Sequence, residues 1–302
     1  MAKKSLSRLE AGLSLAAAAL VLTAAATGVF YEAIYKDENL SFATQAVAQD
    51  FVTALVAVPL FLLCLLWAAR GSLRARLGWL GILFYFVYTY LMYAVATVFN
   101  PLFLVYTAAY SLALIALILG LTRLDLGQVK AIFGERTPRR TVGIYCIAMG
   151  SALGLIWVKV IIEAMISRGT SFLFQQQTSQ SLVIQAMDLG LVVPLGVIGG
   201  VLLLRRRPAG YLLASVLMMK VVTLLTAVWA MAILMLVRDV GGEPQAVVII
   251  GIVDLIGIAL AAWFFASAKS GKAAGAESTE DTEKKDGGAK APPYSALRDP
   301  AD

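Results

Sequence analysis

Long apolar runs alternate with short polar segments along most of the chain. A membrane-spanning helix needs about 20 mostly apolar residues, and eight runs are long enough. They cover residues 11–35, 51–69, 77–99, 101–121, 141–166, 182–204, 209–237 and 246–266. The pattern therefore predicts an all-α integral membrane protein with eight transmembrane helices.

The composition supports this prediction. Sixty per cent of the residues are hydrophobic and 15% are charged, whereas soluble domains are nearer to half apolar and a quarter charged. The net charge of +6 does not indicate nucleic-acid binding, because the basic residues form short clusters between apolar runs and not a stripe on a polar face. Membrane lipids are the expected surroundings.

Lys and Arg residues are unevenly divided between the two sides of the predicted bundle. In the short segments that flank the spans, sixteen lie on one side, while Lys36, Arg168 and Arg238 lie on the other. Because loops rich in Lys and Arg remain in the cytoplasm, both termini are predicted to be cytoplasmic. The basic start followed by an Ala-rich run also fits a cleaved signal peptide, which is an alternative to a first span.

The two halves of the membrane region carry similar landmarks in the same order, which indicates an internal duplication. The paired landmarks are Glu32 and Glu163, Asp50 and Asp188, Pro59 and Pro194, Arg70 and Arg205, Gly78 and Gly210, and Pro101 and Pro244. Since each half has four helices, an even number, the repeats should be parallel and related by a pseudo-two-fold axis along the membrane normal.

This duplication sets the expected domain organisation. The first four-helix repeat would cover residues 1–121, a cytoplasmic connector 122–140 and the second repeat 141–268. Residues 269–302 have little apolar surface to bury and are predicted to be a disordered cytoplasmic tail.

Polar residues inside the apolar runs are the candidates for function. A charge at mid-bilayer costs about 2.5–3.5 kcal/mol even on lenient scales, and tyrosines in the third run share one helix face. We expect these groups to surround a ligand cavity. The alternatives are a position at the membrane interface, among headgroups and water, for the carboxylates, and hydrogen bonding between helices for the tyrosines. The predicted ligand-binding residues are Glu32, Asp50, Tyr85, Tyr88, Tyr93, Asn100, Glu163 and Asp188.

Two further pairs are predicted to be structural ion pairs. Lys159 and Glu163 are four residues apart on one helix, a spacing that brings side chains together. Lys220 and Asp254 lie at similar depths on consecutive antiparallel helices, so each could neutralise the other.

Several kinds of chemistry are disfavoured. The chain has no histidine, which excludes His-ligated metal or haem sites and an imidazole base. Its two cysteines, Cys64 and Cys146, lie inside apolar runs and do not indicate a disulfide framework. P-loop, serine-hydrolase and intramembrane aspartyl protease motifs are missing, so neither a cofactor, a metal nor an enzymatic activity is expected.

Two resemblances add to this picture. Residues 49–121 with 188–233 resemble a group of uncharacterised prokaryotic polytopic membrane proteins, which implies a prokaryotic cytoplasmic membrane. Each four-helix unit also resembles the EXPERA domain of the sigma-2 receptor and the emopamil-binding sterol isomerases. The residues that carry this second resemblance are Glu32, Asp50, Pro59, Arg70, Gly71 and Ser72 in the first unit, and Glu163, Asp188, Pro194 and Arg205 in the second.

The EXPERA resemblance implies carboxylates that face a lipid-accessible cavity and hold a cationic amine. The isomerases also use a histidine, so the lack of histidine argues against sterol isomerisation. The sequence thus predicts a membrane-embedded binding protein for an amphiphilic or cationic lipid-like ligand, held by carboxylates in the outer half. The alternatives are a proton- or cation-coupled secondary transporter, with its site between the halves, and an accessory membrane subunit without a small ligand.

Overall fold

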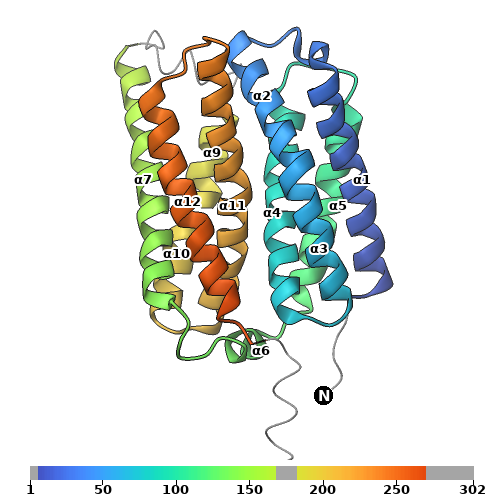
Figure 1. Ribbon diagram of the computed structural model, residues 1–302, viewed down its shortest axis with the longest axis vertical. Coiled ribbons are helices and arrows are strands. Elements are labelled where there is room, and N and C mark those ends of the chain that lie inside the picture. Colours follow the sequence, from blue (N-terminus) through green and yellow to red (C-terminus); the bar gives the residue numbers. More distant parts are fainter. Residues whose placement is uncertain (1–5, 168–181, 270–302) are drawn as a thin grey trace, which may run out of the picture. The chain divides into compact units, whose positions relative to one another are not determined.

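The computed structural model describes residues 6–167 and 182–269. Within them, eight helices are long and apolar enough to cross a membrane, which confirms an all-α membrane fold. The long helices run side by side, and the short helix α6 lies across one end (Figure 1), called here the α6 end. No strand is present in this part of the chain, where Phe133 and Ala268 form an isolated β-bridge.

The helices follow the predicted runs with shifted ends. Their bounds are α1 Arg8–Phe30, η1 Glu32–Tyr35, α2 Leu40–Val52, η2 Thr53–Ala57, α3 Val58–Ala69, α4 Leu73–Ala96, α5 Phe103–Thr122, α6 Leu126–Ala131, α7 Arg139–Ile166, α9 Val183–Met187, η3 Asp188–Val192, α10 Val193–Leu204, α11 Pro208–Val237 and α12 Pro244–Ala266. α2, η2 and α3 form one continuous span, and α9, η3 and α10 form another.

The first span is shorter than predicted. α1 ends at Phe30, because Tyr31 leaves the helical region at φ −135° and ψ 69°. The chain then makes the 3-10 turn η1, which carries Glu32. Glu32 therefore lies beyond the end of the apolar helix and not within it.

The second span begins earlier than predicted, at Leu40 and not near residue 51. The side chain of Asn39 accepts a hydrogen bond from the Phe42 N–H (2.7 Å) and caps the helix. Polar side chains in this first part lower its hydropathy, yet they are largely turned into the bundle, and Gln49 and Asp50 are buried. Asp50 thus lies ten residues, about 15 Å, inside the span.

Two spans contain a five-residue π-helical turn. η2 ends two residues before Pro59, and η3 ends two residues before Pro194. A proline lacks an N–H and crowds the preceding helical turn, so a wider turn is a reasonable local response. Counted back from the two prolines, Asp188 corresponds in position to Thr53 and not to Asp50. The internal repeat itself stays a prediction.

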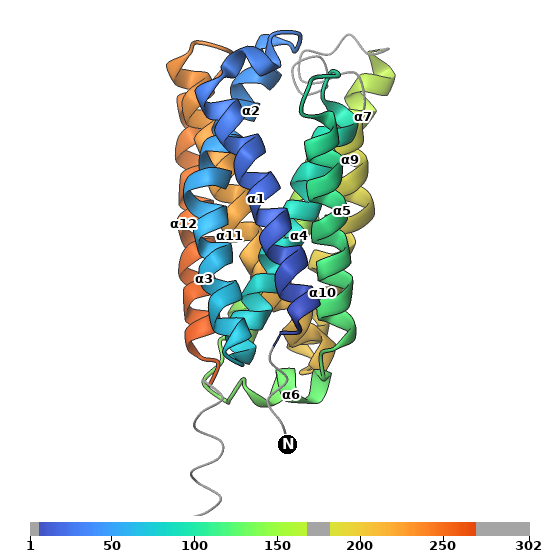
Figure 2. The same cartoon turned by 90° about the vertical axis from the view of Figure 1, so that its right-hand side faces the viewer.

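α4 is the most buried of the eight spans. It packs against α3, α5 and α11, and α1 lies against α5 on the outside of this group (Figure 2). In the second half, α7 packs mainly against α10 and makes few contacts with α11 and α12. This looser packing of α7 leaves space inside the bundle.

Candidate functional site

This space is a cavity of about 410 Å³. Its walls come from α2, α4, α7, α11 and the span formed by α9, η3 and α10. On α11 the lining runs from Leu217 to Met231, which is fourteen residues or about 21 Å along the helix axis. Apolar side chains such as Leu153, Leu224 and Val228 form most of the surface. The cavity is therefore long and mainly hydrophobic.

Four side chains form a polar group inside this apolar cavity, and we call them the Lys220 cluster: Tyr88, Trp157, Asp188 and Lys220. The Tyr88 hydroxyl donates to Asp188 Oδ1 (2.8 Å), and Trp157 Nε1 donates to Asp188 Oδ2 (2.8 Å). The Lys220 Nζ lies over the Tyr88 ring, 3.9 Å from its centroid. Four different helical elements thus contribute to one polar site.

Lys220 has few partners in this cluster. Lys220 is 2% exposed. Its ammonium lies over the aromatic rings of Tyr88 and, at 5.9 Å from the centroid, Phe84. It forms neither a hydrogen bond nor an ion pair with any residue that the structure describes. Burying a charge is costly unless it is paired and hydrogen-bonded, so the cavity is the side from which this ammonium can gain acceptors.

The predicted ion pair between Lys220 and Asp254 is wrong. Asp254 instead accepts hydrogen bonds from Thr226 Oγ1, at 3.3 and 3.1 Å. Thr226 is six residues after Lys220, which at about 100° per residue places it roughly 120° away around α11. Lys220 and Asp254 have similar depths, but Asp254 contacts the face of α11 that carries Thr226 and not the face that carries Lys220.

Asp50 forms a second buried polar site, behind the wall of the cavity. It is fully buried, and its two oxygens accept hydrogen bonds from Tyr35 (2.5 Å) and Tyr93 (3.1 Å). Tyr93 lines the cavity, whereas Asp50 does not. Burial, together with the Asp50 charge, raises the pKa of Tyr35 well above its usual range, so this hydroxyl stays a donor. Asp50 can influence a cavity ligand only through Tyr93.

The remaining tyrosine of the predicted stripe joins two helices. The Tyr85 hydroxyl accepts from Gln49 Nε2 (2.6 Å) and shares a hydrogen bond with Thr53 Oγ1 (2.7 Å). Tyr85 does not line the cavity, although Gln49 does. Asn100 also lies outside the lining, where its side chain accepts from the Leu102 N–H (2.9 Å) before α5 begins.

The two glutamates among the predicted ligand residues do not line the cavity either. Glu32 makes a two-fold ion pair with Arg238 at 2.7 and 3.0 Å, which joins the η1 turn to the end of α11. Glu163 pairs with Lys159 at 3.7 Å on the exposed side of α7, which confirms the predicted i, i+4 pair. Both carboxylates already have cationic partners.

A smaller, more polar pocket of about 220 Å³ lies at the end of the bundle opposite the α6 end. It is lined by Tyr35, Glu38 and the Glu32–Arg238 pair, among others. Glu38 accepts a hydrogen bond from the Val98 N–H (2.6 Å), and burial raises the pKa of Glu38 above its usual value. Tyr35 belongs to this pocket and bonds Asp50, so it connects the pocket with the cavity wall.

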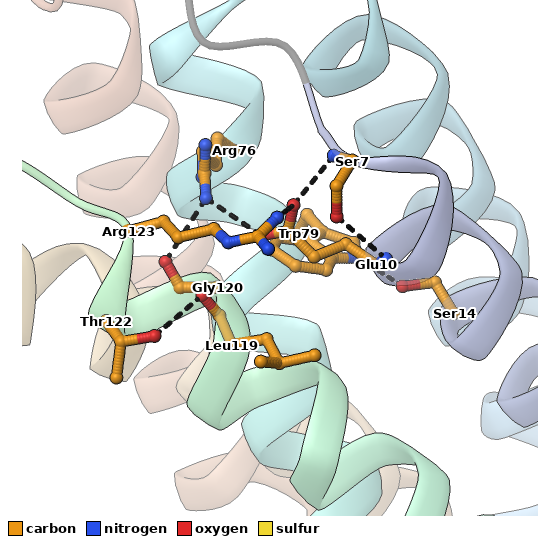
Figure 3. Close-up of polar contacts among 9 residues, drawn as sticks. All are labelled: Ser7, Glu10, Ser14, Arg76, Trp79, Leu119, Gly120, Thr122 and Arg123. Carbon is orange, nitrogen blue, oxygen red and sulfur yellow. Dashed lines mark hydrogen bonds and ion pairs between the residues drawn. The ribbon is translucent and has the colours of Figure 1, made fainter.

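A third polar group lies near the α6 end. Glu10 is fully buried and makes ion pairs of 2.9 Å with Arg76 of α4 and Arg123 at the end of α5 (Figure 3). Ser7 and Glu10 also cap α1 reciprocally, with the Ser7 N–H donating to Glu10 Oε2 (2.7 Å). We call Glu10, Arg76 and Arg123 the Glu10 triad. It joins three helices far from the cavity and is a structural element.

The sequence analysis did not predict several residues of the cavity, and it paired Lys220 with the wrong residue. Trp157 was not expected, although a buried aspartate needs donors and an indole N–H is one of few available in an apolar helix. Gln49 stands next to Asp50 in the sequence and was not among the predicted ligand-binding residues. Lys220 was recognised as a buried charge but was given a structural role. Among residues 6–167 and 182–269, no group of three or more Cys, Asp or Glu side chains could hold a metal ion.

No protein-family model, curated protein or solved structure matches the chain.

Proposed function

We propose that the protein is a membrane-embedded binding protein for an amphiphilic, lipid-like molecule, and that the cavity between α2, α4, α7 and α11 is its binding site. The observation that carries this proposal is the combination of a long, mostly apolar lining with a small number of polar side chains, the Lys220 cluster among them. Binding sites for small molecules are typically mostly apolar, with a few placed polar groups that orient the ligand. An amphiphile has this same division.

The position of the polar groups favours an amphiphile over a purely cationic ligand. Asp188 is the carboxylate that lines the cavity, and each of its oxygens already accepts a hydrogen bond. Asp50 is likewise bonded by two tyrosines and lies behind the wall. Asp50 therefore does not meet a bound amine, and Asp188 would meet one only with both of its oxygens already hydrogen-bonded. The secondary transporter and the accessory subunit stay predictions from the sequence.

Filling the cavity is expected to weaken binding of a neutral single-chain amphiphile. Leu153→Trp places a larger side chain in the cavity, so it should lower the affinity for methyl oleate about tenfold or more, a loss of ~1.4 kcal/mol. Equilibrium binding to the delipidated full-length protein in detergent micelles measures this effect.

Leu155→Trp is the matched control. Leu155 lies on the same helix, is 71% exposed and does not line the cavity, so this substitution should leave the affinity unchanged. Equal affinities for both variants, or no saturable binding to the unmodified protein, would contradict the proposal.

A further inference from the structure

We propose that the ligand is a single-chain amphiphile with a carboxylate head group, and that the Lys220 ammonium binds this carboxylate. The inference rests on the proposed function, since it names the chemistry of the molecule in the same cavity. It reverses the charge expected from the sequence: the group that reaches the ligand is a cation and not an acid.

The first argument is the unsatisfied bonding capacity of Lys220. An ammonium has three N–H donors and no acceptor, and this one is buried among apolar helices, with aromatic ring faces on one side. Cation–π contact stabilises a desolvated cation, but it replaces only part of the lost hydration. Because Lys220 lines the cavity, acceptor oxygens placed there would complete its coordination.

Asp188 does not fill this role. Its oxygens are oriented by neutral donors, Tyr88 and Trp157, and it makes no ion pair with Lys220 among the described residues. Coulomb energy falls with distance. A ligand carboxylate at hydrogen-bond distance from Nζ is therefore attracted by Lys220 more strongly than it is repelled by the more distant Asp188. The donors on Asp188 also hold that carboxylate in place while the ligand binds.

The dimensions of the cavity indicate one alkyl chain. Its volume of about 410 Å³ lies near the lower end of the range of roughly 300–1,000 Å³ for drug-sized ligands. From Lys220 to Met231 the α11 wall continues for eleven residues, about 16 Å. Apolar side chains such as Leu224 and Val228 line this wall, and α2 with its N-cap adds the polar Asn39, Gln45 and Gln49 to the lining. A head group at Lys220 would thus have room for one extended tail, whereas a lipid with two chains would need a much wider space.

Three probes with the same tail test the head group: oleate, methyl oleate and oleylamine. Binding to the delipidated full-length protein in micelles should be about tenfold or more tighter for oleate than for methyl oleate, and weakest for oleylamine. Lys220→Met, which keeps a long apolar stem without the charge, should lower oleate affinity to the level of methyl oleate. Lys159→Met removes an exposed lysine of α7 and should change none of the three affinities.

The order of affinities in the unmodified protein decides the proposal even if Lys220→Met does not fold. Equal binding of oleate and methyl oleate, or a preference for oleylamine, would overturn it. If Leu153→Trp still weakened all the probes that bind, the cavity would remain the binding site and only the head-group assignment would fail. If none of the three probes bound, both the inference and the proposed function would be refuted.

Discussion

Gly28→Ala is expected to destabilise the protein by about 3 kcal/mol or more, because the new methyl group would overlap the Asp50 carboxylate. A Cβ built on Gly28 would lie against Asp50 Oδ2 and 2.7 Å from its Cγ. Overpacking a well-packed site costs about 1–3 kcal/mol. Displacing the carboxylate would also weaken the hydrogen bonds from Tyr35 and Tyr93, and bonds to charged groups contribute about 1.5–3 kcal/mol each.

Gly12→Ala is the matched control on the same helix. No atom lies within 4 Å of a Cβ at Gly12, so this substitution should stabilise α1 by roughly 0.5–1 kcal/mol through its higher helix propensity. The free energy of unfolding in mixed micelles measures both variants. Similar stabilities for Gly28→Ala and Gly12→Ala would show that Asp50 does not lie against α1.

The sequence predicted the spans because hydropathy depends on local composition alone. Each apolar run is long enough to cross the hydrocarbon core, and the structure has a long helix in every one of them. The start of α2 was missed for the same reason: its polar residues lower the local hydropathy, yet Gln49 and Asp50 are buried and hydrogen-bonded to tyrosines of other elements. A hydropathy average records how many polar groups a helix has but not where they point.

Depth along a helix could be counted from the sequence, but direction around the helix could not. Lys220 and Asp254 have similar depths, and the sequence therefore paired them. The structure turns Lys220 toward Tyr88 and Asp254 toward Thr226. Which faces meet depends on how α4, α11 and α12 pack, and side chains far apart in the chain decide that packing.

The predicted duplication contained a clue to the Lys220 cluster. Tyr88 and Lys220 each lie ten residues after a glycine landmark, Gly78 and Gly210 respectively. If two halves are related by a two-fold axis, residues at equivalent positions close to that axis face each other. The contact between Lys220 and Tyr88 is the kind that such an axis would produce, so the repeat would have predicted their proximity better than equal depth did.

The Glu10 triad was missed although its local signal was present. Ser7 and Glu10 have the spacing of a capping box, and the structure contains that box. Charge counting treated Arg76 and Arg123 only as markers of the cytoplasmic side. No local pattern brings them to Glu10, since the three residues come from three different helices. Their meeting depends on α1 packing beside α4 and α5.

Glu10→Ala is therefore expected to cost about 3–5 kcal/mol of stability, because removing one partner of a buried ion pair leaves the other charge uncompensated. Arg76 is almost as buried as Glu10, with 5% of its side chain exposed, whereas 43% of the Arg123 side chain is exposed. The buried charge of Arg76 should hence account for most of the stability lost with Glu10. The expected result is measured as the free energy of unfolding in mixed micelles.

Two comparisons separate this effect from general loss of a surface charge. Glu163→Ala removes a carboxylate from the exposed pair with Lys159 and should cost less than about 0.5 kcal/mol, as is usual for such pairs. The double variant Glu10→Leu with Arg76→Met removes both buried charges, so it should be more stable than Glu10→Ala alone, as strong coupling between contacting residues requires. Two results would contradict this role of Glu10: a double variant whose loss equals the sum of the separate losses at Glu10 and Arg76, or a Glu10→Ala variant that costs no more than Glu163→Ala. In either case Glu10 would not hold α1, α4 and α5 together, and its ion pairs would contribute as little as those on the surface.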